Sequence, residues 1–185
     1  MFDITEIHDN DFVTVRLITN ETVYGVVLNH SGDYVVLKEY LDFTYLGYKF
    51  ISSKFISDIK RYKPVDMLAK IVSAEKMTEV DSEYRFLSEI GSSDQLLKEL
   101  QSTHRVCIFH EDGEHLTLGR LFKIAGKYLF IQRILTDFVY EKTYFRLHKH
   151  SISMIELGSE YLRVYRDYSD EPVDHSGDEK GNTYE

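Results

Sequence analysis

The strongest constraint on the fold is that two stretches of the chain, residues 11–59 and 104–155, repeat one pattern. Glycine and tyrosine positions match at a constant offset: Gly25 with Gly119, Gly32 with Gly126, and Tyr34 with Tyr128. After one inserted residue, an Asp-Phe-x-Tyr motif also recurs, at Asp42, Phe43 and Tyr45 and at Asp137, Phe138 and Tyr140. So many matches in order predict an internal duplication, in which each copy is one structural unit.

Each copy has the pattern of short β-strands. Val13, Val15 and Leu17 alternate with polar residues, as a half-buried strand requires. Five strands are expected per copy, over 12–17, 23–28, 34–40, 45–51 and 55–59, then around Cys107 and over 116–122, 128–134, 140–147 and 152–157. A glycine inside the second strand favours a bend. Five short, bent strands favour a closed barrel, because closure removes exposed sheet edges.

The expected fold is therefore mainly β with a helical linker (α+β): two small β-barrels over 1–62 and 103–165, related by duplication. Residues 63–102 have helical spacing, and Pro64 suits a first helical turn. Ser92 is a candidate N-cap, with Gln95 three residues later, for a helix that buries Leu96, Leu97 and Leu100. Residues 166–185 are acidic and almost without apolar side chains, so we expect a disordered tail.

The second copy resembles an Sm-like domain. A helix with Leu96, Leu97 and Leu100 precedes V106-C-I-F-H-E-D-G113 and then L118-G119-R120-L121. That family has a short N-terminal helix and a small, strongly bent five-stranded barrel. The first copy matches the rhythm with V23-Y-G-V-V-L28. The family's RNA-binding Asn falls at Tyr34 and Tyr128, and its Arg-Gly step keeps only Gly47 in the first copy, so neither copy keeps the RNA-binding Asn and Arg.

Charge is distributed unevenly along the chain. The net charge is −9, made up of −3 over 1–62, −3 over 63–102, +2 over 103–165 and −5 over 166–185. An RNA-binding Sm-like protein would therefore use the mildly basic second unit, because phosphate binding requires dense positive charge. The candidate contacts to a partner or to RNA are Arg120, Lys123, Arg133, Tyr34, Tyr128, Tyr45 and Tyr140. For the last two, a structural role in turns and core is the stronger interpretation.

The leading hypothesis is a non-enzymatic protein-binding or assembly module, with RNA binding as the alternative. An acidic, tyrosine-rich chain could inhibit a basic partner. The resemblance implies pairing through strand edges, either between the two copies as an intramolecular pseudo-dimer or between chains in a ring-like homo-oligomer. Tyr161, Tyr165 and Tyr168 have helical spacing and indicate either a docked helix or a partner-binding strip; docking is the stronger expectation.

We expect no catalytic, cofactor-binding or metal site. The sequence has no phosphate-binding glycine loop and no nucleophile with an evident base. Cys107 alternates with apolar residues and suits packing. His148 and His150 could begin a metal site, but only with ligands from a neighbouring strand, such as His110, His115, Glu111 or Asp112. No apolar run reaches the roughly 20 residues of a membrane span, and the expected location is the cytoplasm.

Overall fold

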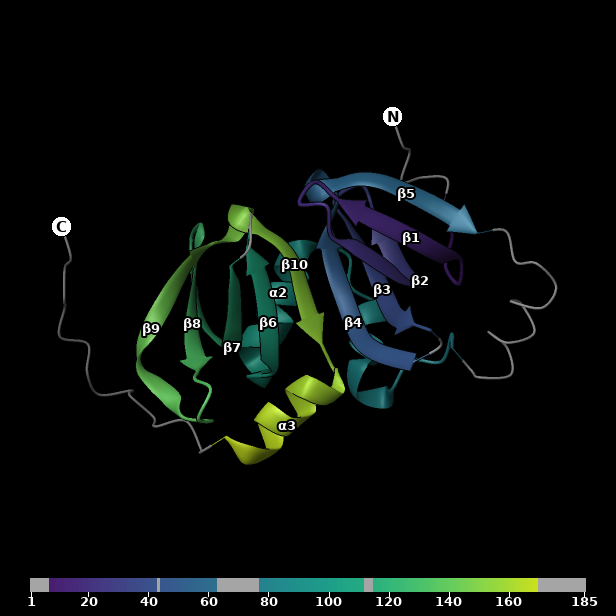
Figure 1. The fold of residues 1–185 in the computed structure, drawn as a ribbon. Helices are drawn as coiled ribbons and strands as arrows, with labels where there is room; N and C mark the ends of the chain where they lie inside the picture. Colours follow the sequence, from purple (N-terminus) through teal and green to yellow (C-terminus); the bar gives the residue numbers. More distant parts are fainter. Residues whose placement is uncertain (1–6, 43, 63–76, 112–114, 170–185) are drawn as a thin grey trace.

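The computed structural model describes residues 7–42, 44–62, 77–111 and 115–169, and ten strands lie within these ranges (Figure 1). The first half of the chain contributes β1 (Phe12–Leu17), β2 (Thr22–Ser31), β3 (Tyr34–Leu41), β4 (Thr44–Ser52) and β5 (Ile56–Tyr62). The second half contributes β6 (Val106–Glu111), β7 (Leu116–Ala125), β8 (Tyr128–Ile134), β9 (Tyr140–His148) and β10 (Ile152–Leu157). All ten predicted strands are therefore confirmed, with β2 and β7 longer than expected.

These strands form one open antiparallel sheet in the order β5-β1-β2-β3-β4-β10-β6-β7-β8-β9. The mainly β character is confirmed, but the prediction of two closed small β-barrels is wrong. Among the described strands β5 pairs with β1 alone, and β10 uses its second side to pair with β4 of the other half. Glycines and bulges along a strand predict that it bends, but they do not say which edges the bend brings together.

Within this sheet the two halves follow the same strand order and local register. Val13 faces Gly25 in the first half, and Cys107 faces Gly119 in the second. Register shifts fall at corresponding places: after Val27 and Leu121 in β2 and β7, and beside the start of β5 and β10.

Gly25 and Gly119 have a steric role at these corresponding positions. A Cβ on Gly25 would lie 2.5 Å from the Lys38 carbonyl oxygen, and one on Gly119 would lie 2.3 Å from that of Gln132. Only glycine lets the bent strand approach its neighbour so closely.

The apolar interior does not divide at the boundary between the halves. The largest buried cluster combines side chains from β2, β3 and β4 with others from β6 to β10 and from the helical segments. Tyr48 and Phe50 of the first half share this cluster with Ile155 and Leu157 of the second. Eight of the ten described strands thus share this core, while β1 and β5 line a second buried cluster that Met154 of β10 also joins.

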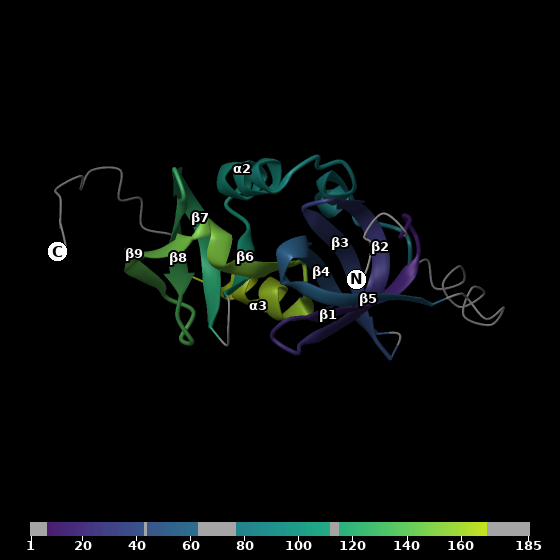
Figure 2. The same ribbon diagram turned by 90° about the horizontal axis from the view of Figure 1, so that it is seen from above.

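Short helices cover the sheet on two sides. Figure 2 shows α2 (Ser93–Thr103) and α3 (Glu160–Tyr168) on opposite sides of β6, where α2 packs on β7 and α3 on β6. The predicted cap of α2 is confirmed, because Ser92 Oγ accepts a hydrogen bond from Gln95 N at 3.2 Å. Leu96, Leu97 and Leu100 are buried as expected.

The other predicted helices have mixed outcomes. A 3₁₀ helix, η3 (Ser82–Ser88), occupies the predicted second helical stretch, whereas the stretch after Pro64 lies outside the described residues. α3 docks through Leu162 and Tyr165, while Tyr161 and Tyr168 are exposed. It extends two residues beyond Arg166, where the acidic tail was expected to begin, and residues 170–185 lie outside the described residues. No described helix is both long and apolar enough to cross a membrane.

Candidate functional site

The joint between the halves is the antiparallel pair β4–β10. Ile51 faces Met154, Phe50 faces Ile155, Lys49 faces Glu156, and Tyr48 faces Leu157. The four β4 side chains are all buried. Three apolar pairs and one ion pair therefore hold the two halves together.

The ion pair belongs to a buried cluster of charges. Lys49 Nζ contacts the Glu156 carboxylate and lies 3.2 Å from Glu39 Oε2, and His110 Nε2 lies 3.8 Å from Glu156 Oε2. Burial alone would raise the pKa of Glu156, but the neighbouring His110 and Lys49 outweigh it and lower this pKa to about 2. Burial raises the pKa of Glu39, and the nearby Lys49 only partly opposes it. Lys49 thus forms ion pairs with two carboxylates in a buried site.

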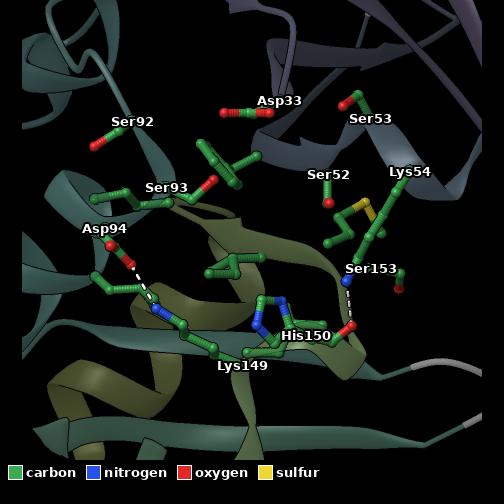
Figure 3. A pocket seen from close by; sticks show the side chains of 16 residues that line it. Asp33, Ser52, Ser53, Lys54, Ser92, Ser93, Asp94, Lys149, His150 and Ser153 are labelled. Carbon is green, nitrogen blue, oxygen red and sulfur yellow. Dashed lines mark hydrogen bonds and ion pairs between the residues drawn. The ribbon is translucent and has the colours of Figure 1, made fainter. Parts of the chain in front are cut away.

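A cavity of about 390 Å³ lies beside the joint (Figure 3). Two one-turn 3₁₀ helices reach it from the two halves: η2 (Ser53–Phe55), before β5, and η4 (Lys149–Ser151), before β10. They bring Lys54, Lys149 and His150 to one rim, where Lys54 Nζ donates to the His150 carbonyl and Lys149 Nζ lies 3.0 Å from Asp94 Oδ1. A second carboxylate, Asp33, also lines the cavity, and apolar side chains and serines complete the lining: Phe50, Leu96, Leu97, Ile152, Met154, Ile155, Ser52, Ser53, Ser92, Ser93 and Ser153.

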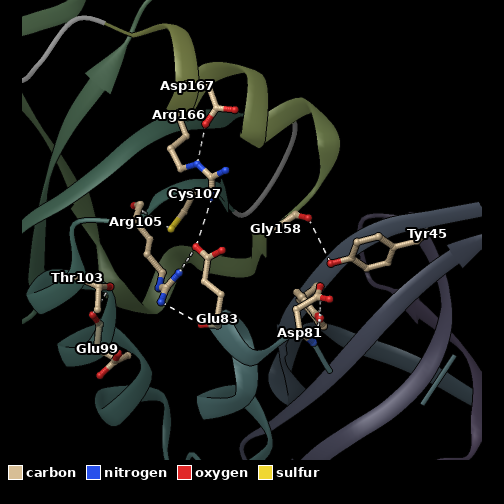
Figure 4. Close-up of polar contacts among 11 residues, drawn as sticks. Tyr45, Asp81, Glu83, Glu99, Thr103, Arg105, Cys107, Gly158, Arg166 and Asp167 are labelled. Atoms are coloured by element: carbon tan, nitrogen blue, oxygen red, sulfur yellow. Dashed lines mark hydrogen bonds and ion pairs between the residues drawn. The ribbon is translucent and has the colours of Figure 1, made fainter. Parts of the chain in front are cut away.

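Polar contacts on the α3 side also cross the joint (Figure 4). The Tyr45 hydroxyl donates to the Gly158 carbonyl at 3.2 Å. Arg105 at the start of β6 binds Glu83 of η3 through its carboxylate at 2.6 Å and its carbonyl at 3.0 Å. Arg166 Nη1 lies 3.4 Å from the same carboxylate oxygen. These contacts tie η3 and α3 to both halves.

Three of the four predicted tyrosines serve the core. Tyr34 is buried, stacks on Phe50 and donates its hydroxyl to the Ile90 carbonyl at 2.5 Å, so its ring cannot stack on a base. Tyr45 is half-buried and bonded to Gly158. Tyr140 is buried beneath Arg120, whose Cζ lies 4.8 Å from the ring centroid.

Tyr128 is the predicted tyrosine that stays partly open. Its ring lies edge-on to His148 at 5.5 Å and beneath Arg146, whose Cζ is 4.9 Å from the centroid. His148 directly precedes η4, but neither Tyr128 nor His148 lines the 390 Å³ cavity.

The structure does not bring the predicted basic residues together. Arg120 faces Gln132 and Arg133 faces Gly119, so the two guanidinium side chains leave opposite faces of the β7–β8 pair. Arg133 is also held by Glu141 through two hydrogen bonds of 2.7 Å and lies over Phe145. Lys123 is exposed farther along β7.

The basic side chains that do converge are those of Lys54, Lys149 and His150. The sequence analysis missed them as a group because they come from opposite halves. The available signal was the match of Ser53-Lys54 with Lys149-His150, which precede the fifth strand of each repeat.

The remaining candidates are a thiol and two imidazoles. Cys107 is fully buried, and burial raises the pKa of its thiol. The rings of His148 and His150 lie 5.4 Å apart. Among the described residues, no three His, Cys, Asp or Glu side chains are grouped so that they could hold a metal ion. Asp112, one of the suggested ligands, lies outside those residues.

The comparisons with known proteins give no further guide: no family model, no curated protein and no solved structure matches this chain.

Proposed function

We propose that this protein is a non-enzymatic assembly module whose copies associate head to tail through strand edges. One observation carries the proposal. The strand β9 of the second half corresponds to β4 of the first half, and β5 of the first half corresponds to β10 of the second. The chain already pairs β4 with β10, so a second copy can pair its β5 with β9 in the same way. A head-to-tail contact of this kind builds a ring or a filament.

The corresponding registers of the two halves support a duplicated origin, and with it this equivalence of edges. If β9 pairs with β5 of the next copy in the register in which β4 pairs with β10, Phe145 of β9 lies opposite Lys60 of the next copy. Tyr144 then lies opposite Arg61. Lys60 and Arg61 are exposed in the single chain. Aromatic side chains on one edge thus face cations on the other, a favourable cross-strand combination.

Light scattering coupled to gel filtration, from about 1 to 100 µM protein, tests this proposal. The expected mass is a multiple of 21.8 kDa that grows with concentration. The K60E/R61E variant should remain monomeric, because glutamates face the aromatic edge without a cation. K98E, on the exposed side of α2, is the matched control and should associate like the parent chain. A monomer throughout this range, or association unaffected by K60E/R61E, contradicts the proposal.

Single-stranded RNA binding is the second candidate function, and the cavity at the joint favours it. Lys54, Lys149 and His150 bring basic side chains to its lining, beside the carboxylates of Asp33 and Asp94, and the partly exposed ring of Tyr128 packs against His148, next to η4. Partial desolvation and the nearby Lys127, His150 and Lys54 lower the pKa of His148, so basic side chains gather around η4.

The RNA test is a titration with a fluorescent oligouridine at about 50 and 200 mM salt. Binding should weaken steeply with salt and be lost in K54E/K149E. K123E, on β7 away from the cavity, should bind normally. Equal losses in the two variants would mean that general charge, rather than the cavity, attracts RNA.

A further inference from the structure

A second cavity, of about 180 Å³, lies on the α3 side of the joint. Its lining comes from η3, from the start of β6 and from the turn into α3, and includes three arginines and one carboxylate: Arg105, Arg163, Arg166 and Glu83. This volume is smaller than the roughly 300–1,000 Å³ of pockets that enclose a drug-sized ligand. The cavity therefore suits a compact charged group whose remainder projects into solvent.

Arg105 is held in place at the inner wall. Its guanidinium carbon lies 5.1 Å from the Tyr84 ring centroid and 5.4 Å from that of Phe86, so two aromatic faces fix its plane. Nη1 and Nη2 bind Glu83, but Nε is buried without a hydrogen-bond partner among the described residues. A buried donor without an acceptor is costly and indicates that an acceptor is missing.

Carboxylates of α3 also bind two of these arginines: Arg163 pairs with Glu160 and Asp167, and Arg166 Nε lies 3.0 Å from Asp167 Oδ1. Glu83 is the carboxylate that joins Arg105 to Arg166. A single oxygen, Oε1, lies 2.6 Å from Arg105 Nη1 and 3.4 Å from Arg166 Nη1, so one atom serves two guanidinium groups (Figure 4). The Glu83 side chain is 46% exposed and can turn outward into water. An anion with more oxygens than a carboxylate could replace it and reach more of the donors.

We propose that Arg105 and Arg166, with Arg163 at the rim, bind a phosphate monoester group that displaces Glu83. Such a group carries nearly two negative charges at neutral pH and three terminal oxygens. Two oxygens can serve the guanidinium groups that now share Oε1, and the third can reach Arg105 Nε. Arginine is suited to this recognition because its planar fork of donors matches phosphate geometry. A phosphorylated side chain and a nucleoside monophosphate present the same group.

Calorimetric titration with O-phosphoserine and with AMP tests the site, with serine and adenosine as the matched probes that lack the phosphate. Saturable 1:1 binding of the phosphorylated probes alone is expected, and the tighter of the two identifies the source of the phosphate. R105Q should weaken binding about tenfold or more, and R166Q several-fold. E83Q should tighten binding about threefold or more, because it removes the competing carboxylate.

The controls separate the site from general charge and from misfolding. R85Q removes an exposed arginine of η3 that does not line the cavity, and it should bind like the parent chain. R166Q changes a 44% exposed side chain, so it remains informative if R105Q fails to fold. The proposal is overturned by equal losses in R85Q and R166Q, by weaker binding in E83Q, or by no saturable binding up to about 10 mM probe.

Discussion

Replacing Lys49 by methionine should destabilise the protein strongly, because Lys49 is the buried cation between Glu39 and Glu156. Its side chain is 8% exposed, and those of the two carboxylates are 15% and 12% exposed. Methionine keeps the length of the side chain but leaves two buried carboxylates without their cation. Removing one partner of a buried pair costs about 3–5 kcal/mol.

The pKa of Glu156 reflects the whole charge cluster, in which His110 and Lys49 both favour the ionised carboxylate. Its fall from 4.5 to about 2 corresponds to roughly 3 kcal/mol of preferential stabilisation of the ionised form. A carboxyl group with a lowered pKa in the folded state contributes stability above about pH 4.5 and loses it as the pH falls toward 2. In K49M, protonation of Glu39 and Glu156 at low pH removes the cost of two buried negative charges. The gap between parent and variant should therefore be largest near pH 7 and shrink toward pH 4.

Urea unfolding followed by circular dichroism at pH 7 and pH 4 measures both effects, and tyrosine fluorescence provides a second probe in a chain without tryptophan. K98M is the matched control, because Lys98 is exposed on α2 and surface substitutions usually change stability by less than about 0.5 kcal/mol. Our interpretation of the joint is refuted if K49M costs less than about 1 kcal/mol at pH 7, or if its cost is the same at both pH values.

Two further outcomes are expected. G119A should lower the free energy of unfolding by about 1–3 kcal/mol, because the new Cβ would lie 2.3 Å from the Gln132 carbonyl oxygen. G32A, with no atom within 4 Å of its Cβ, should stay within about 0.5 kcal/mol of the parent chain; urea unfolding of both variants decides, and equal costs would contradict the steric argument. Cys107 should resist iodoacetamide in the native protein, because burial raises the pKa of its thiol, and it should react once urea unfolds the chain. Mass spectrometry measures the adduct, and rapid labelling of the native protein would contradict this prediction.

Local elements of this fold could be predicted because their signals are local. Alternation of Val13, Val15 and Leu17 identified β1, and Ser92 with Gln95 identified the start of α2. The pairing of β4 with β10 could not be predicted in this way, because it joins residues more than one hundred positions apart. Nothing near Phe50 or Ile155 in the sequence indicates that they face each other.

The candidate site residues show the same limit. The repeat located Tyr34 and Tyr128 at matching positions, yet one is a core residue and the other is partly open. Burial of a repeated position depends on what packs against it. Ile90, from the segment between the two halves, accepts a hydrogen bond from the Tyr34 hydroxyl. Arg120 and Arg133 were both predicted to contact a partner or RNA, but strand alternation places them on opposite faces.

The place of β10 also constrains how the molecule is made. It is the last of the ten described strands to leave the ribosome, yet it lies in the middle of the sheet between β4 and β6. Until residues 152–157 emerge, the hydrogen-bonding groups along one side of both β4 and β6 lack their partner, and the first half cannot complete its structure alone. A fragment truncated before Ile152 should therefore be prone to aggregation, although it retains nine of the ten strands.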